Sequence, residues 1–179
     1  DNTGQASCKA CPAGKFQSFT GVTSCNQCAP GSYASGTGSA SCTSCGTGYY
    51  QTGYGKTSCT ICPAGHKCLN ATRNPEPCAP GTYQKSNGAE ECTTCPKGHK
   101  CDGIALTRAT ACVNGEYQDK LGQESCQICP VGHQCSNAAI SPVACEPGSF
   151  TSAINTIECT KCFVSEYQDE AGKTSCKSC

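Results

Sequence analysis

Cysteine is the residue type whose number and spacing point to chemistry in this chain. There are 22 cysteines among 179 residues, far above the usage of an ordinary cytosolic domain. Most of them stand in Cys-x-x-Cys pairs: Cys8/Cys11, Cys25/Cys28, Cys42/Cys45, Cys59/Cys62, Cys92/Cys95, Cys126/Cys129, Cys159/Cys162 and Cys176/Cys179. Thiols in such an arrangement either become oxidised to disulfides or bind zinc as thiolates.

The period of the pairs favours disulfides over zinc. The first four pairs are evenly spaced along the chain, the next three steps are nearly twice as long, and the last step returns to the short spacing. A four-thiolate zinc site would group the pairs two by two, and an even period offers no such grouping. We therefore expect a disulfide scaffold from an oxidising compartment, with no metal and no cofactor.

Seven copies of one unit predict the main disulfides. Each copy reads Cys-x-x-Gly-x-(Tyr/Phe) with small departures, and its second Cys always follows the first at the same distance. Closing each copy at its base predicts Cys11–Cys25, Cys28–Cys42, Cys45–Cys59, Cys78–Cys92, Cys112–Cys126, Cys145–Cys159 and Cys162–Cys176. A cross-link over a loop of this length contributes about 3 kcal/mol in the chain-entropy account.

Three inserts carry the remaining internal cysteines, and their pairing is less constrained. The favoured pairs are Cys62–Cys68, Cys95–Cys101 and Cys129–Cys135. An interlocked alternative, Cys62–Cys78 with Cys68–Cys92, stays open. Cys8 and Cys179 are left over and are expected to link to further modules or to another chain.

The repeats define the expected domain organisation. Residues 8–61 form three short modules, residues 62–161 form three long modules that each contain an insert, and residues 162–179 form a terminal short module. We expect the whole to be part of a longer array. Each module should contact only its neighbours, which predicts a rod.

The elements that position the cysteines are expected to be small irregular β-hairpins. Cys11-Pro12-Ala13-Gly14 fits a β-turn with Pro second and Gly fourth. The chain then reverses at Gly21, a residue that tolerates positive φ. The equivalent reversal positions are Gly38, Gly55, Gly88, Gly122, Asn155 and Gly172. The expected fold class is small and disulfide-rich: an elongated tandem array of irregular β-hairpin modules with little helix.

Two recurring positions, one aromatic and one histidine, each have a structural and a functional interpretation. An aromatic residue follows each turn, at Phe16, Tyr33, Tyr50, Tyr83, Tyr117, Phe150 and Tyr167. We interpret these rings as a miniature core rather than as a ligand-binding ladder. His66, His99 and His133 share one insert position, and we expect them to be exposed on turns rather than to bind metal.

Composition and charge exclude several functions. Thirteen basic and 13 acidic residues cancel, which argues against nucleic acid and against an anionic membrane surface. No apolar run approaches the roughly 20 residues that span a bilayer, so direct membrane insertion is not expected. No residues suggest a catalytic constellation, so we expect no enzyme. Asn70-Ala71-Thr72 is the one complete N-glycosylation sequon and predicts a glycoprotein.

The repeated pattern Cys-Pro-x-Gly-x-(Tyr/Phe), ending in Ser-Cys-x-x-Cys, resembles the ephrin-receptor-like cysteine-rich repeat of the growth-factor-receptor cysteine-rich superfamily. It is also similar to the simplest module of tumour-necrosis-factor receptors. The resemblance runs from Cys8 to Cys179, with Ser165 in place of a turn glycine and Asn155 in place of a hairpin glycine. It implies an extracellular or cell-surface, elongated, disulfide-laddered fold.

Two functions are compatible with these features. The first is a non-enzymatic structural segment, the rod of a surface coat, stalk or fibre that assembles end to end into filaments. Its partners would be further copies of itself or adjoining cysteine-rich repeats. The second is a receptor or adhesin ectodomain that binds a protein or glycan ligand, for which an exposed apolar patch would be the mark.

Overall fold

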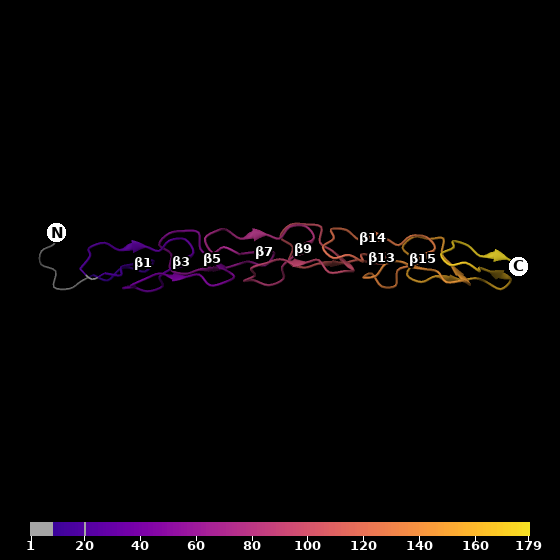
Figure 1. Cartoon of the computed structure of the whole chain (residues 1–179), viewed down its shortest axis with the longest axis horizontal. Helices are drawn as coiled ribbons and strands as arrows, with labels where there is room; N and C mark the ends of the chain where they lie inside the picture. Colours follow the sequence, from indigo (N-terminus) through magenta and orange to yellow (C-terminus); the bar gives the residue numbers. More distant parts are fainter. Residues whose placement is uncertain (1–8, 20) are drawn as a thin grey trace. The chain divides into compact units, whose positions relative to one another are not determined.

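The computed structural model describes residues 9–19 and 21–179. The described chain divides into two compact units. The N-terminal unit holds the described residues up to Pro77 together with Gln84–Cys92, and the C-terminal unit holds Cys78–Tyr83 together with Thr93–Cys179. Within each unit the hairpins succeed one another in sequence order (Figure 1).

Ten two-stranded antiparallel sheets make up the regular structure of the described residues, which contain no helix. Each sheet is a hairpin of two-residue strands, numbered here 1 to 10 along the chain. Hairpins 1–5 are β1 (Lys15–Phe16) with β2 (Asn26–Gln27), β3 (Ser32–Tyr33) with β4 (Thr43–Ser44), β5 (Tyr49–Tyr50) with β6 (Thr60–Ile61), β7 (His66–Lys67) with β8 (Glu76–Pro77) and β9 (Thr82–Tyr83) with β10 (Thr93–Thr94). Hairpins 6–10 are β11 (His99–Lys100) with β12 (Thr110–Ala111), β13 (Glu116–Tyr117) with β14 (Gln127–Ile128), β15 (His133–Gln134) with β16 (Val143–Ala144), β17 (Ser149–Phe150) with β18 (Thr160–Lys161) and β19 (Glu166–Tyr167) with β20 (Lys177–Ser178). The fold is therefore a small disulfide-rich tandem array of β-hairpins, as the sequence predicts.

The inserts of the long modules are hairpins in their own right. Hairpins 4, 6 and 8 lie in these inserts, so each long module contains two hairpins. Insert hairpin 6 closes with a hydrogen bond of 2.8 Å from Cys112 N to Gly98 O, and hairpin 2 closes in the same way from Cys45 N to Gly31 O. A hairpin of nearly constant length is thus the structural repeat, although the cysteine pattern alternates between two forms.

The turn that opens each hairpin lies one residue later than the sequence analysis placed it. In hairpin 1, Lys15 N donates to Pro12 O at 3.1 Å, so Pro12 is the first residue of the turn and Gly14 the third. Gly14 has φ +82°, and a type II turn requires positive φ at its third residue. Ser165 occupies the same place in hairpin 10 with φ +69°. The reversal positions predicted to tolerate positive φ, including Asn155, all have it.

Successive hairpins are joined by a regular set of backbone hydrogen bonds. The reversal residue of one hairpin donates its amide to the carbonyl of the cysteine that opens the preceding hairpin. Examples are Gly55 N to Cys28 O at 2.8 Å, and Gly122 N to Cys95 O at 2.8 Å. Because these donors and acceptors are main-chain atoms, this set of bonds depends little on which side chains a hairpin carries.

The prediction that modules contact only their neighbours is wrong. Gly14 of hairpin 1, in the first short module, packs directly on the Gly55 carbonyl of hairpin 3, in the third short module. Gly132 of hairpin 8 packs in the same way on the Gly172 carbonyl of hairpin 10, although these two hairpins belong to adjacent modules because a long module contains two hairpins. A Cβ atom at either position would overlap that oxygen. Each of these turn glycines therefore brings hairpin n against hairpin n + 2, which the sequence period alone does not reveal.

The buried interior is made of cystine rather than of large apolar side chains. Among the described residues the buried apolar set consists of ten cysteines and Ala34. The recurring rings are mostly half-buried, and Tyr167 is 45% exposed. The rings therefore flank a core of sulfur atoms, and the disulfides supply the cross-linking that apolar burial cannot.

Candidate functional site

The disulfide ladder is the one arrangement of reactive residues that recurs through the described part of the chain. Six disulfides join an opening cysteine to the cysteine 14 residues later: Cys11–Cys25, Cys28–Cys42, Cys45–Cys59, Cys112–Cys126, Cys145–Cys159 and Cys162–Cys176. Cys78 and Cys92 are both disulfide-bonded as well. In each of the six, the Cα atoms lie 5.7 or 5.8 Å apart, within the range that an unstrained disulfide needs.

The insert hairpins use a second, shorter disulfide. Cys62–Cys68, Cys95–Cys101 and Cys129–Cys135 each span six residues. The structure therefore contains the favoured pairing of Cys62 and not the interlocked alternative. Cys179 is free and exposed, whereas Cys8 lies outside the described residues.

One position explains how two disulfide patterns fit one hairpin. It lies six residues after the opening cysteine and faces the interior. In insert hairpins it is the partner cysteine, such as Cys101, and in most other hairpins it is glutamine, such as Gln118. Both Cys101 and Gln118 are almost fully buried, at 0% and 2% exposed. A buried glutamine and a disulfide thus replace each other at this place.

The glutamine acts as a latch across the loop of its hairpin. Gln118 Nε2 donates to Ser125 O at 2.8 Å, and its Oε1 accepts from Lys120 N at 3.1 Å. The same two contacts recur for Gln17, Gln51, Gln84 and Gln168. Each latch joins the two sides of its loop, and at Gln118 and Gln168 it satisfies side-chain polar atoms that would otherwise be costly to bury.

The sequence analysis missed these glutamines. The signal was present, because five of the seven predicted aromatic positions are followed directly by Gln: Phe16-Gln17, Tyr50-Gln51, Tyr83-Gln84, Tyr117-Gln118 and Tyr167-Gln168. Glutamine is usually exposed in folded proteins, so its recurrence after the aromatic residue does not by itself predict burial. Thr151 takes the position in hairpin 9 and Ala34 in hairpin 2, so neither has the amide needed for the latch.

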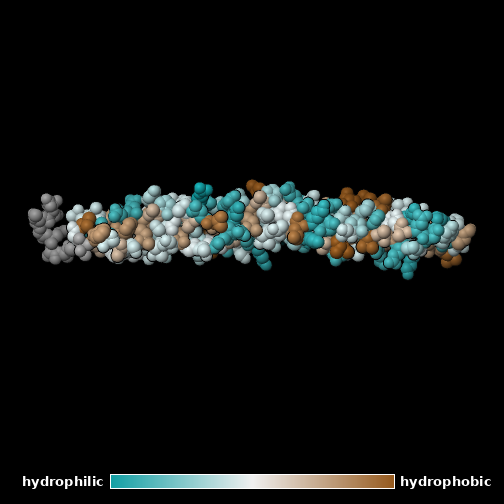
Figure 2. Space-filling view, viewed as in Figure 1, coloured by the Kyte–Doolittle hydropathy of each residue, from teal (hydrophilic) through white to brown (hydrophobic). Residues whose placement is uncertain are grey.

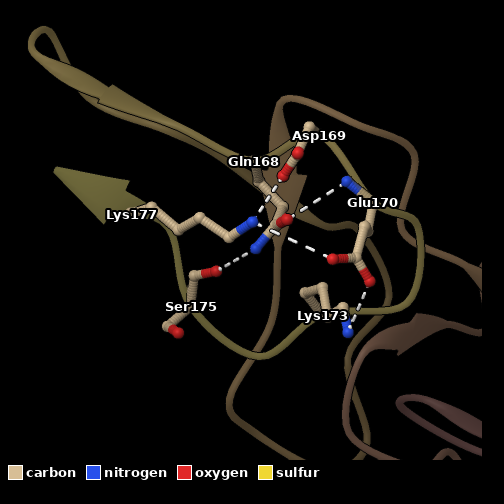
Figure 3. Close-up of polar contacts among 6 residues, drawn as sticks. All are labelled: Gln168, Asp169, Glu170, Lys173, Ser175 and Lys177. Atoms are coloured by element: carbon tan, nitrogen blue, oxygen red, sulfur yellow. Dashed lines mark hydrogen bonds and ion pairs between the residues drawn. The ribbon is translucent and has the colours of Figure 1, made fainter. Parts of the chain in front are cut away.

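The loop of hairpin 10 carries a small charge network around its latch (Figure 3). Lys177 Nζ lies 2.6 Å from Asp169 Oδ1 and 3.8 Å from Glu170 Oε1. Lys173 Nζ lies 2.8 Å from Glu170 Oε2. The hydrogen bond from Lys177 lowers the pKa of Asp169, and the hydrogen bond from Lys173 lowers the pKa of Glu170. These side chains are solvent-exposed, so the network is a surface feature of modest strength.

The three histidines occupy equivalent places in β7, β11 and β15. In each, the ring Nδ1 lies near the carbonyl oxygen two residues earlier, at 3.2 Å for His66, 3.1 Å for His99 and 3.0 Å for His133. The rings are half-buried strand residues held against the opening turn, rather than fully exposed turn residues as predicted.

Exposed aliphatic side chains are most frequent in the C-terminal unit (Figure 2). Ile104, Val113, Leu121, Ile128 and Ile154 are each between 55% and 68% exposed. Ile104, Leu121 and Ile154 each precede the reversal residue of their loop, Val113 lies in the opening turn of hairpin 7, and Ile128 ends its second strand. In the N-terminal unit, the loop of hairpin 4 contributes one strongly exposed large apolar side chain, Leu69, at 77%.

A search of residues 9–19 and 21–179 for a helix long and apolar enough to cross a membrane finds none. The same stretches hold no cluster of three or more His, Cys, Asp or Glu side chains suited to a metal ion.

The comparisons with known proteins agree with this architecture. Residues 1–41 and 31–73 match the family described as tyrosine-protein kinase ephrin type A/B receptor-like. No curated protein matches the chain. Residues 1–73 therefore carry ephrin-receptor-like cysteine-rich repeats. That family is a receptor-like repeat rather than an enzyme domain, and together with the many disulfides it indicates an extracellular module.

Proposed function

We propose that the chain is a structural segment of an extracellular coat, stalk or fibre, whose work is to hold a length of chain stiffly rather than to catalyse a reaction. Its partners would be adjoining repeats or further copies of the same array, joined end to end into filaments. The observation that carries the proposal is the repeated main-chain bonding between successive hairpins, with a disulfide inside each of the nine hairpins whose bridge is described above.

Three features of the hairpins support stiffness. Each turn glycine that packs on the hairpin two places further on restrains bending between neighbours. The buried glutamine latches limit the motion of the loops that carry these contacts. A disulfide within each hairpin prevents it from opening under load without bond cleavage.

Small-angle X-ray scattering of the oxidised chain tests the rod. A compact globule of this length would have a radius of gyration of about 16 Å. We expect a clearly larger value and a scattering profile typical of a rod. A radius near the compact value would contradict the proposal. Electron microscopy of native material tests the end-to-end assembly, for which periodic filaments are expected and isolated short rods are not.

A receptor or adhesin ectodomain is the second candidate, and the exposed aliphatic residues of the C-terminal unit favour it. A set such as Val113, Leu121 and Ile128 is more apolar than a simple spacer needs, and exposed apolar surface often marks a binding site. In this reading a protein or glycan ligand binds along the C-terminal unit.

Replacing Leu121 and Ile128 by serine separates the two functions. A structural segment should keep its assembly and its cell-surface attachment, because neither residue takes part in the bonding between hairpins. An adhesin should lose attachment to its target by tenfold or more. Exposed Ile61, replaced by serine in the N-terminal unit, is the matched control.

A further inference from the structure

The loop of hairpin 4 contains the asparagine and the threonine of the N-glycosylation sequon, and an exposed apolar residue precedes the asparagine. Asn70 is exposed, and its Oδ1 accepts hydrogen bonds from Thr72 N at 2.9 Å and from Thr72 Oγ1 at 2.7 Å. Arg73 N donates to Asn70 O at 3.1 Å and closes the turn. Among the described residues no group is hydrogen-bonded to Nδ2 of Asn70, so the amide nitrogen is accessible to a reagent.

Hairpin 8 provides the same turn without the hydroxyl. Asn137 lies eight residues after its opening cysteine, as Asn70 does, and its Oδ1 accepts from Ala139 N at 2.9 Å. Ile140 N donates to Asn137 O at 3.3 Å. The backbone turn therefore forms without a hydroxyl, and Thr72 is not needed to fold it. Its hydroxyl completes the acceptor sequence Asn-x-Thr, which Asn137-Ala138-Ala139 lacks.

The residue before each asparagine also differs. Leu69 precedes Asn70 and is 77% exposed, whereas the exposed residue Ser136 precedes Asn137. An aliphatic side chain this open to water favours being covered. A sugar attached to Nδ2 of Asn70 would place its apolar ring face within reach of Leu69, whereas Ser136 has no such surface to cover.

We propose that Asn70 carries an N-linked glycan and that the first sugar covers Leu69. A membrane oligosaccharyltransferase would supply the glycan from a lipid diphosphate-linked oligosaccharide. The bond from Nδ2 to C1 of the sugar forms, the bond from C1 to the diphosphate oxygen breaks, and the amide loses one proton. The inference requires passage through the secretory pathway, but it does not depend on the structural role proposed above.

Mass spectrometry of the whole chain, secreted by a eukaryotic cell, tests the attachment. We expect a glycan on Asn70 and none on Asn137. Thr72→Ala should remove the glycan with little change in the hairpin, as hairpin 8 shows, and Ala139→Thr should add a second glycan at Asn137. An unmodified Asn70 in the secreted, disulfide-bonded chain would overturn the proposal, and so would a glycan that persists in Thr72→Ala.

A second measurement tests the contact with Leu69. Leu69→Ser is compared in the glycosylated chain and in the Thr72→Ala chain by retention on a hydrophobic-interaction column. We expect a clear loss of retention in the Thr72→Ala chain and less than half of that loss in the glycosylated chain. Equal losses in the two chains would show that the sugar leaves Leu69 uncovered.

Discussion

At the scale of single residues, the buried glutamine latch is the feature that the cysteine repeat did not predict. Gln118 is 2% exposed, and both ends of its amide are bonded to the main chain of its own loop. In insert hairpins the same place holds a disulfide sulfur, as at Cys101. A neutral side chain can stand in for a covalent cross-link here because it also joins the two sides of the loop.

Replacing Gln118 by alanine should destabilise its loop locally. The change leaves the Lys120 amide and the Ser125 carbonyl without partners, at a cost of about 1–3 kcal/mol. Hydrogen exchange of the Lys120 amide should therefore become roughly 5- to 150-fold faster. Gln127→Ala is the control, because Gln127 is exposed and the hydrogen bond of its side chain is the one that Oε1 accepts from the Tyr117 hydroxyl. Equal effects of the two changes would contradict the latch.

The cysteine spacing predicted the disulfides within the hairpins, but it did not predict the buried glutamines. A spacing of 14 residues is informative because it repeats in every copy, and the structure contains six disulfides of that span. The burial of Gln118 and Gln168 depends on the neighbouring loop main chain, which no residue pattern shows directly. Ala105, with φ +54°, also escaped notice because alanine gives no sign of a reversal.

At the scale of elements, the hairpin depends on its opening turn. The third residue of that turn needs positive φ, and in several hairpins it must also lack a side chain. Gly132 and Gly148 differ in the second requirement. Both have positive φ, but only Gly132 lies close to a carbonyl of another hairpin. The sequence predicted a turn with glycine, but it did not predict the contact between hairpins n and n + 2.

Alanine at these two glycines should have unequal effects. Gly148→Ala should cost about 1–2 kcal/mol, the usual penalty for a side chain in the left-handed region. Gly132→Ala should cost about 1–3 kcal/mol more, because its Cβ would overlap the Gly172 carbonyl and push the two hairpins apart. Denaturant unfolding of the two variants measures the difference, and equal costs would mean that the close packing contributes nothing.

The charge network of hairpin 10 should make that hairpin slightly sensitive to pH. The folded pKa values of Asp169 and Glu170 lie below their ordinary values of 3.8 and 4.5, so their stabilisation is present above those values and is lost as the pH falls below them. The pKa of Lys177 is raised by its hydrogen bond to Asp169, so its stabilisation is present below 10.5 and is lost as the pH rises further. Between these limits stability should be flat.

Amide exchange of Glu170 measures this effect. The protection of this amide, corrected for the intrinsic pH dependence of exchange, should fall below about pH 4, and Asp169→Asn should weaken the change without affecting hairpins 6 and 7. A steep pH dependence near neutrality would contradict the assignment, because none of these groups is expected to titrate there.

At the scale of the whole molecule, the disulfides replace an apolar core. The buried apolar side chains of the described residues are cysteines with one alanine, so little would hold the hairpins together after reduction. The composition predicted this directly, since the chain has no Trp or Met and only four Phe. The domain boundaries at residues 61 and 161 stay a prediction.

Reduction should therefore unfold the chain completely. We expect a strong reductant at neutral pH to remove the protection of all the hairpin amides without any denaturant. Peptide-bond circular dichroism and hydrogen exchange before and after reduction report the change. A reduced chain that keeps its protected amides would show that packing, and not cross-linking, holds the fold.

Peptide mapping of the protein under non-reducing conditions tests the central claim most directly, because it identifies which sulfur atoms are joined. The account predicts the longer link, as in Cys11–Cys25, in hairpins 1–3, 7, 9 and 10, and the shorter link, as in Cys95–Cys101, in hairpins 4, 6 and 8. Peptides joining Cys62 to Cys78, free thiols throughout the array, or bound zinc in amounts matching the cysteine pairs would contradict it.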